Sequence, residues 1–288
     1  MKADLAHEAA AVPVLDPARR FGGIDRLYGA GSVAALARGH ACVIGIGGVG
    51  SWAAEALARS GVGALTLIDL DQVAESNINR QVHALDATLG QAKVDAMAAR
   101  IASFNPLCVV HVVDDFLTAD NAAALLQGFD VVIDAIDNVA AKVAIAVICR
   151  SRRLPLVMAG GAGGKLDPAR LGVDDLARTI QDPLLAKVRA RLRKEHGFSR
   201  EPGKSFGIEA VFSDETLRHV GAGRETAVCD TGITDTPPRS AGVHGLACAG
   251  YGSSMMMTAS AGLLCAQRAL VHLLRAGSAA AIGKEIQS

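Results

Sequence analysis

Short apolar runs alternate along the first 160 residues with longer segments in which apolar positions recur at helical spacing. The runs lie at 42–46, 64–68, 109–113, 129–133 and 156–159. The helical segments lie at 51–59, 85–105, 120–127 and 139–153. Runs this short and this continuously apolar are typical of buried parallel strands, and each helix would cross over between two of them. The pattern therefore predicts an α/β fold with a doubly wound parallel sheet.

The regular alternation stops after Leu171. A helix is expected at 174–195, a strand at 210–213 and a long loop at 221–241, where the Pro237–Pro238 pair excludes a helix. The segment 243–274 is apolar with no charge before Arg268. By hydropathy alone it could span a membrane. Its many Gly, Ser and Thr residues favour a buried core or dimer-interface helix instead.

The segments suggest three parts. Residues 1–18 form a flexible N-terminal tail and residues 19–170 form the core. Residues 171–288 form a C-terminal part that completes the same globule, with a basic helix, a loop and an apolar helix.

Charge is balanced over the whole chain and uneven within it. The 288 residues include 29 Lys and Arg against 29 Asp and Glu, which argues against a uniformly basic coat for nucleic acid. The expected helix at 174–195 carries a concentrated set of cations, and such a set suits a polyanion partner as well as a solvated face. They are Lys187, Arg189, Arg191, Arg193 and Lys194.

Neither the N-terminus nor the cysteines indicate export. Residues 1–13 are Ala-rich with Asp4 and Glu8, unlike the basic and apolar regions of a signal peptide. None of the 6 cysteines forms a C-x-x-C pair, so neither a paired-cysteine zinc site nor a disulfide framework is expected. We expect a cytoplasmic protein.

The first strand ends in a glycine-rich turn that is typical of a nucleotide site. Gly45, Gly47, Gly48 and Gly50 form a G-x-G-G-x-G pattern before the helix at 51–59. Glycines allow close approach to phosphate, and the N–H groups at a helix start bind its negative charge. Asp69 follows Gly50 by 19 positions, at the end of the second strand, where a Rossmann-type unit carries its ribose-binding acid.

Charged residues farther along separate nucleotidyl transfer from hydride transfer. Asn77 and Arg80 lie in the run SNINRQ, Lys93 ends GQAK, and Asp134 and Asp137 lie in DAIDN at the end of a strand. Fixed cations over the phosphates suit a reaction in which negative charge moves onto a leaving pyrophosphate. A strand-end carboxylate suits a bridging Mg²⁺.

These motifs, together with the D-x-D pair Asp69 and Asp71, occur in one order over 42–138. In this the chain resembles the ubiquitin-activating-like adenylyltransferases, a superfamily that includes the molybdopterin- and thiamine-synthesis activating enzymes. The resemblance implies a Rossmann-like adenylation fold. It also implies ATP and Mg²⁺ as cofactors and a homodimer.

Further segments narrow the resemblance to one family. RFGGIDRLYG, NINRQVHAL, VDDF, GGAGGKLDP, DLARTIQDPL and ACAGYGSSMM together are similar to the bacterial tRNA threonylcarbamoyladenosine dehydratases. The family implies ATP-dependent cyclisation of threonylcarbamoyladenosine at position 37 of tRNA. The threonine carboxylate would be adenylylated, and the neighbouring carbamoyl group would then close the ring.

The resemblance assigns expected roles residue by residue. The four glycines of the turn would hold the phosphates, and Asp69 would hold the ribose, with Asp71 beside it in the nucleotide site. Asn77, Arg80 and Lys93 would neutralise the triphosphate, and Asp137 would bind Mg²⁺. The basic helix that begins near Lys187 would contact the tRNA backbone.

Three further assignments concern less regular segments. A cysteine desulfurase and its sulfur-acceptor protein are implied as partners, and Cys248 would be either the relay thiol for them or a catalytic nucleophile. Arg26 is the candidate to reach a partner subunit's ATP, because Gly23 stands where the superfamily has a second Arg. The glycine-rich loop 160–165 fails as a P-loop, since Leu166 replaces the Mg²⁺-binding Ser or Thr. It is expected to line the active site or a monovalent cation.

Two other functions stay open from the sequence. One is an activating enzyme for a small sulfur-carrier protein, against which the basic helix and the missing zinc cysteines count. The other is an NAD-dependent dehydrogenase, against which Arg80, Lys93 and Asp137 count.

Overall fold

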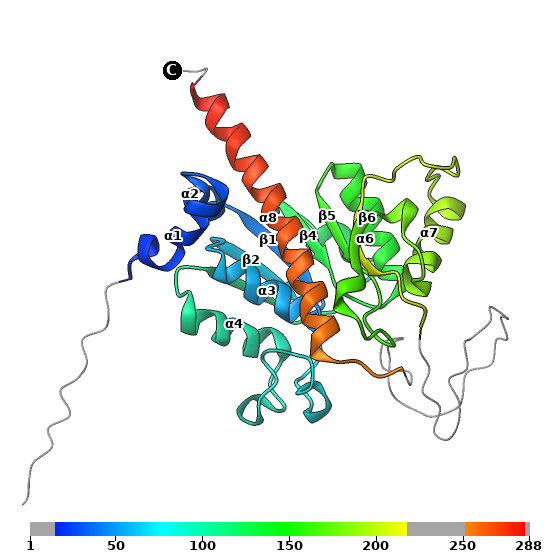
Figure 1. Ribbon diagram of the computed structural model, residues 1–288, viewed down its shortest axis with the longest axis horizontal. Helices are drawn as coiled ribbons and strands as arrows, with labels where there is room; N and C mark the ends of the chain where they lie inside the picture. Colours follow the sequence, from blue (N-terminus) through cyan, green and yellow to red (C-terminus); the bar gives the residue numbers. More distant parts are fainter. Residues whose placement is uncertain (1–14, 218–250, 286–288) are drawn as a thin grey trace, which may run out of the picture.

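The computed structural model describes residues 15–217 and 251–285, and these build a single seven-stranded sheet with helices on both faces (Figure 1). The strand order is β3-β2-β1-β4-β5-β7-β6, and every neighbouring pair is parallel except β6 with β7. The strands are β1 (His40–Ile44), β2 (Ala64–Ile68), β3 (Val109–Val113), β4 (Val131–Asp134), β5 (Leu156–Ala159), β6 (Leu171–Asp175) and β7 (Glu209–Ser213). The doubly wound Rossmann-like sheet predicted from the sequence is confirmed.

The helices divide between the two faces according to the side chains that they bury. α3, α4 and α8 contribute to one buried cluster, whereas α5, α6 and α7 contribute to the other. The small helices α1 and α2 precede β1 and pack against each other. The helices are α1 (Pro17–Tyr28), α2 (Ser32–Leu36), α3 (Gly50–Arg59), α4 (Lys93–Phe104), α5 (Ala122–Leu125), α6 (Val139–Arg152), α7 (Pro183–Glu195) and α8 (Met255–Glu285).

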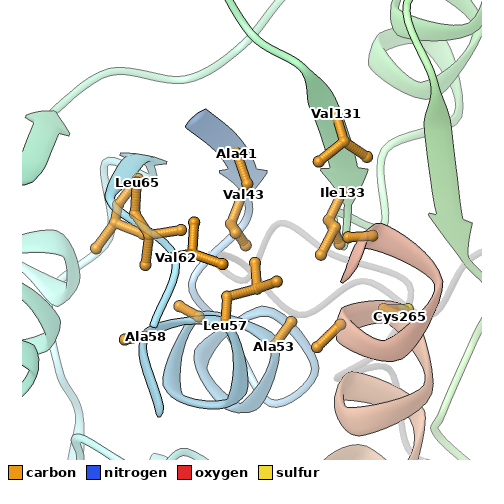
Figure 2. Close-up of a cluster of buried hydrophobic side chains, with 14 of the residues drawn as sticks. Ala41, Val43, Ala53, Leu57, Ala58, Val62, Leu65, Val131, Ile133 and Cys265 are labelled. Carbon is orange, nitrogen blue, oxygen red and sulfur yellow. The ribbon is translucent and has the colours of Figure 1, made fainter. Parts of the chain in front are cut away.

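Successive side chains along a strand point to opposite faces of the sheet and therefore belong to different buried clusters. In β1, Ala41 and Val43 point toward α3 and α8, while Cys42 and Ile44 belong to the opposite cluster. Figure 2 shows Leu57 of α3 and Cys265 of α8 meeting the inner face of β1 and β4. Because the central strands are buried on both sides, their sequences are continuously apolar and carry no strict alternation.

The prediction of a helix at 174–195 is wrong for the first half of that range. Leu171–Asp175 forms the antiparallel edge strand β6, and a 3-10 turn, Leu176–Arg178, follows it. The helix begins only at Pro183, after Asp182, whose carboxylate accepts a hydrogen bond from the Leu185 N–H. Proline fits the first helical position, and a capping Asp before it marks the true start.

The helix expected at 85–105 starts later, at Lys93. A 3-10 turn, Asp86–Thr88, and Gly90 with its φ of +81° precede it. A positive φ is incompatible with a continuing α-helix, so the apolar residue Leu89 belongs to the turn.

Judged by its described side chains, α8 is a core helix of this fold. Its residues 255–277 are long and apolar enough to cross a membrane by length and composition, but half of the most apolar window is buried inside the molecule. It packs mainly on α3. Gly262 makes this approach possible, since a Cβ there would lie 2.4 Å from the Val49 carbonyl oxygen. The helix continues to Glu285, beyond the expected end at 274, and residues 243–250 lie outside the described part.

Residues on both sides of position 171 share this sheet. β6 and β7 come from the later part, with β7 beside β5 and β6 at the edge, and α8 covers strands of the earlier part. At the N-terminal end α1 begins at Pro17, with Asp16 as its cap, so the last residues of the expected tail are helical.

Candidate active site at the carboxyl edge of the sheet

The glycine-rich turn lies where the strand order reverses, between β1 and β4. Chain connections leave these neighbouring strands in opposite directions, which opens a crevice at their carboxyl ends. Gly45 has a φ of +84°, and a Cβ there would lie 2.8 Å from the side chain of Ile136. At Gly50 a Cβ would lie 1.8 Å from the Gly45 carbonyl oxygen. Both positions therefore require glycine for the turn itself.

Gly47 differs from those two glycines because a Cβ there would meet no atom within 4 Å among the described residues. This side of the turn faces open space. α3 begins at Gly50, and no side chain caps its N-terminus at Val49. The N–H groups of its first turn therefore have no side-chain acceptor from this cap position. An anion at this place would be bound by main-chain donors.

Asp69 fixes the glycine turn from the neighbouring strand. Its carboxylate accepts hydrogen bonds from the Ile46 N–H at 2.6 Å and the Asp71 N–H at 2.8 Å. It is 8% exposed, and burial raises its pKa, while the ammonium of Lys93 acts in the opposite direction. Asp69, which is expected to bind the ribose, thus contacts the glycine turn, which is expected to bind the phosphates.

Arg80 lies beside the same turn. A Cβ at Gly48 would lie 3.4 Å from its side-chain Cγ. The guanidinium donates to the Ser76 carbonyl at 2.7 Å and to the Asn79 side-chain oxygen at 3.0 Å. The Arg80 carbonyl in turn accepts from the Trp52 indole N–H at 3.0 Å. Main chain and side chain are both held, so the cation is pre-positioned next to the turn.

Asn77 shapes the loop that carries Arg80. It is 8% exposed, and its side-chain oxygen accepts from the Ala74 N–H at 3.1 Å, closing the 3-10 turn Glu75–Asn77. In this structure the amide therefore supports the loop.

Lys93 begins α4 and forms an ion pair with Asp71. The Nζ–Oδ2 distance is 2.6 Å. The lysine side chain is 8% exposed and the aspartate side chain 54% exposed, so the pair spans the boundary between the protein interior and the crevice. Lys93 is held with its ammonium at that boundary.

Asp134, the last residue of β4, and Asp137, three positions later, lie in different surroundings. Asp137 is half-buried in the loop between β4 and α6. Asp134 is completely buried and pairs with Lys142, also completely buried, at 3.0 Å. The Lys142 ammonium also donates to the Ala159 carbonyl at 2.8 Å, which joins the ends of β4 and β5. Sequence reasoning missed Lys142, because its position inside a helix gives no indication of a buried partner.

The residues present fit a magnesium ion held mainly by its nucleotide. No group of three or more His, Cys, Asp and Glu side chains suited to a metal occurs within residues 15–217 and 251–285. Mg²⁺ that bridges phosphates uses only one or two carboxylates and keeps several waters. Asp137 can supply such a carboxylate.

The start of α8 connects two loops across this edge. The Asn79 side-chain amide donates to the Ser253 carbonyl at 3.0 Å, and the Gly164 N–H donates to the Gly252 carbonyl at 3.0 Å. A Cβ at Gly48 would also touch Thr258 at 3.0 Å. The turn, the Arg80 loop and the 160–165 loop are therefore brought together by residues far apart in the sequence.

The loop 160–165 is fixed by two buried charged residues. Asp182 accepts from the Gly161 N–H at 2.8 Å and lies so close to Gly160 that a Cβ there would be 2.1 Å from its Oδ2. Lys165 is 2% exposed and donates to main-chain carbonyls, among them that of Gln181 at 2.9 Å.

Of the expected site residues, Arg26 is not brought to this edge. Cys248 lies outside the described residues. Arg26 is exposed on α1, a helix whose Phe21 packs against Gly61 just before β2, at the opposite, amino edge of the sheet. Arg26 is therefore remote from the glycine turn of its own chain.

The basic helix α7 is confirmed as a helix, but its arginines are engaged within the protein. Arg189 donates to the Thr179 hydroxyl, Arg191 pairs with Glu195 at 3.0 Å, and Arg193 donates to the Ser199 carbonyl at 3.2 Å. Lys187 and Lys194 are exposed, and the side chain of Arg191 is 42% exposed within its pair with Glu195.

A cavity of about 690 Å³ opens at the amino edge of the sheet, away from these residues. Its wall includes an ion pair between Arg268 of α8 and Glu209 of β7 at 2.6 Å. Glu209 also meets His272 at 3.2 Å. These contacts tie α8 to the sheet at the end opposite the candidate site.

Comparisons with known proteins agree with this arrangement. A family model described as the ThiF family matches residues 23–282. The chain is 47% identical over 258 residues to the tRNA threonylcarbamoyladenosine dehydratase of Escherichia coli, covering 89% of this chain and 94% of that protein. It is 45% identical over 259 residues to the Haemophilus influenzae protein of the same name, with the same coverage of 89% and 94%. The crystal structure of the E. coli dehydratase in complex with ATP superimposes with a TM-score of 0.78 at 44% identity, covering 93% of this chain and 99% of that one.

Proposed function

The chain belongs to the ThiF family, and we propose that it is an ATP-dependent tRNA threonylcarbamoyladenosine dehydratase. The observation that carries the proposal is the meeting of the glycine turn, Asp69, Arg80 and Lys93 at the point where the strand order reverses. The two dehydratases that match nearly all of the chain supply the substrate.

The reaction needs activation of a carboxylate and no redox step. The threonine carboxylate of the modified adenosine attacks the α-phosphorus of ATP, and pyrophosphate leaves. The neighbouring carbamoyl group then attacks the acyl-adenylate carbonyl, AMP leaves, and the ring closes with loss of a proton. The substrate loses the elements of one water molecule, whose oxygen leaves with AMP. Ring closure within one molecule benefits from a high effective concentration of the attacking group.

The residues at the carboxyl edge suit these steps in different ways. The turn from Gly45 to Gly50 supplies main-chain donors for phosphate, and Asp69 accepts the ribose hydroxyls. Arg80 and Lys93 stabilise charge on the α-phosphate and the departing pyrophosphate. Asn77 supports the Arg80 loop and Asp71 positions Lys93, as their contacts indicate.

Magnesium would be held at Asp137 together with the phosphates. When bound, it neutralises charge on the leaving pyrophosphate. The monovalent cation expected near residues 160–165 takes no part in these proposed steps.

The remaining proposals concern partners. tRNA would lie along α7, with Lys187 and Lys194 as exposed cations. The enzyme would act as a cytoplasmic homodimer, in which Arg26 reaches the partner subunit's nucleotide.

A cysteine desulfurase and its sulfur-acceptor protein would meet Cys248 as a relay thiol. Retention of cyclisation by Cys248→Ser together with loss of sulfur exchange would support this role, and loss of cyclisation with intact ATP and tRNA binding would make Cys248 a nucleophile.

The alternative is an adenylyltransferase for a small sulfur-carrier protein, which the same nucleotide site would serve. Mass spectrometry of tRNA nucleosides separates the two functions. After incubation of modified tRNA with enzyme, ATP and Mg²⁺, we expect a nucleoside 18 Da lighter than threonylcarbamoyladenosine, the mass of one water. Reactions without ATP, or with the Lys93→Met variant, are the controls. ATP–pyrophosphate exchange that requires a carrier protein and no tRNA would establish the alternative instead.

A further inference from the structure

Lys165 is a lysine in a place where lysine is rare. It is 2% exposed, although lysine is among the residues least often fully buried. Its ammonium lies among three main-chain carbonyl oxygens: those of Gln181 at 2.9 Å, Ser213 at 3.4 Å and Glu215. An ammonium group has three N–H donors and no acceptor, so the three carbonyls satisfy its protonated form.

These carbonyls come from separate segments that would not otherwise meet. Gln181 precedes the cap of α7 and has a φ of +52°, rare for a residue other than glycine. Ser213 ends β7, and Glu215 follows it. The Glu215 carboxylate returns to the start of the next loop, accepting from the N–H groups of Leu166 and Asp167 at 3.0 Å each. The ammonium thus joins the 160–165 loop to α7 and to the end of β7.

A cage of main-chain carbonyls is the donor set that selects monovalent cations in proteins. Such oxygens replace the hydration shell of K⁺ without adding a negative charge. Another buried lysine, Lys142, provides a contrast: its ammonium meets the Asp134 carboxylate at 3.0 Å. None of the hydrogen bonds of the Lys165 ammonium goes to a carboxylate among the described residues. The nearby carboxylates of Asp182 and Glu215 bind N–H groups of the loop instead.

We propose that the carbonyl cage formed by Gln181, Ser213 and Glu215 is a monovalent-cation site that Lys165 occupies with its own ammonium. The covalently attached cation makes the loop beside the nucleotide edge independent of dissolved K⁺ or Na⁺. Removing the side chain leaves a site for a small cation: K⁺, ammonium or methylammonium.

The test uses two variants of the full-length protein. Lys165→Ala removes the side chain and leaves the cage open, whereas Lys165→Met removes the charge but keeps a chain of similar length in the space. Thermal unfolding is measured in choline chloride, whose cation is too large for the cage. It is then repeated with choline replaced by K⁺, ammonium or methylammonium at constant ionic strength. This readout does not depend on the proposed activity.

In choline we expect both variants to unfold about 5 °C or more below the wild type, because three buried carbonyls lose their donor. Small cations should restore at least half of the loss in Lys165→Ala and change neither Lys165→Met nor the wild type by more than about 1 °C. The restoration should saturate with cation concentration, as binding to one site requires.

Three outcomes would overturn the inference. Unfolding of Lys165→Ala at the wild-type temperature in choline would mean that the cage needs no cation. Early unfolding of Lys165→Ala with no response to any of the three cations would mean that the cage is no cation site. Equal responses of Lys165→Ala and Lys165→Met would place the cations elsewhere. If Lys165→Ala does not fold in choline, purification in ammonium followed by dialysis into choline gives the same comparison.

Discussion

At the scale of single residues, Lys93 shows how the candidate site is arranged for its proposed chemistry. The side chain is buried up to its ammonium, and Asp71 holds that ammonium at 2.6 Å. Removing one charged contact to a developing phosphate charge costs roughly 2–4 kcal/mol of transition-state stabilisation. Lys93→Met should therefore slow AMP formation with modified tRNA by about a hundredfold or more. Lys204→Met, at an exposed lysine, is the control, and near-normal turnover in Lys93→Met would exclude the assigned role.

His83 gives a second residue-scale prediction, for stability against pH. It is 1% exposed, and its two ring nitrogens have no hydrogen-bond partner within the described residues. Burial, followed by the charges of Lys93 and Arg100, lowers its pKa to about 4. An unfolded histidine has a pKa near 6.5, so between the two values the unfolded chain binds more protons. The stabilising effect of the neutral ring is complete above about pH 6.5 and is lost as the pH falls towards 4.

Urea unfolding at pH 7.5 and pH 5.0 measures this effect. We expect the wild type to lose roughly 2 kcal/mol between the two values through His83 alone. His83→Leu fills the space without a titrating group, so its loss should be smaller by about that amount. Equal losses in the two proteins would mean that His83 keeps an ordinary pKa in the folded state.

The candidate site could be predicted from the sequence where the chemistry depends on spacing along the chain. The glycine pattern, Asp69, Arg80 and Lys93 were found this way, and the structure gathers them at one edge. Lys142 and Lys165 were not assigned their partners, because a buried lysine is recognisable only from tertiary contacts. The carbonyl oxygens around Lys165 belong to segments up to 50 positions away.

At the scale of elements, the cations of α7 fall into two groups: some contact neighbouring segments of the protein and others are exposed. Arg189 and Arg193 hold neighbouring segments, whereas Lys187 and Lys194 are exposed. If the helix contacts tRNA, replacing both lysines by Ala should reduce the log–log salt dependence of tRNA binding by about 0.7–0.9 for each lost phosphate contact. ATP binding should remain unchanged. An unchanged salt slope would mean that this helix face is only solvated.

Arg189→Ala is the matched variant on the same helix. Its guanidinium is half-buried and contacts Thr179, and burial lowers its pKa. We therefore expect it to lower the free energy of unfolding by about 1–3 kcal/mol and to leave the salt slope of tRNA binding nearly unaltered.

Strands were predictable where they are continuously apolar, and this includes the largely exposed edge strand β3. β2, β3 and β5 coincide with the apolar runs at 64–68, 109–113 and 156–159. β6 was missed because an edge strand with one exposed face carries polar residues, here Asp174 and Asp175. Its pairing with β7 depends on a segment about 40 residues later, which local periodicity does not reveal.

At the scale of the whole molecule, α8 connects the two edges of the sheet. Its first turn touches Gly48 and the Arg80 loop, and Arg268 binds Glu209 at the amino edge. Because α8 packs on α3, which follows directly from the glycine turn, a shift between these two helices must move the turn. We therefore expect the candidate nucleotide site to depend on the contact between α3 and α8.

Gly262 is the position that tests this dependence. A Cβ there would lie 2.4 Å from the Val49 carbonyl oxygen and 2.9 Å from the Trp52 Cβ, so Gly262→Val must push α8 away from α3. Overpacking of this kind costs about 1–3 kcal/mol, or roughly 2–10 °C in Tm for a protein of this size. Since Val49 and Trp52 flank the end of the glycine turn, the Kd for ATP should also rise severalfold. Gln267→Val, on the exposed face of the same helix, should change the Tm by no more than about 2 °C. Calorimetry of ATP binding on both variants decides the matter: an unaltered ATP affinity in a destabilised Gly262→Val protein would show that the turn keeps its shape independently of α8.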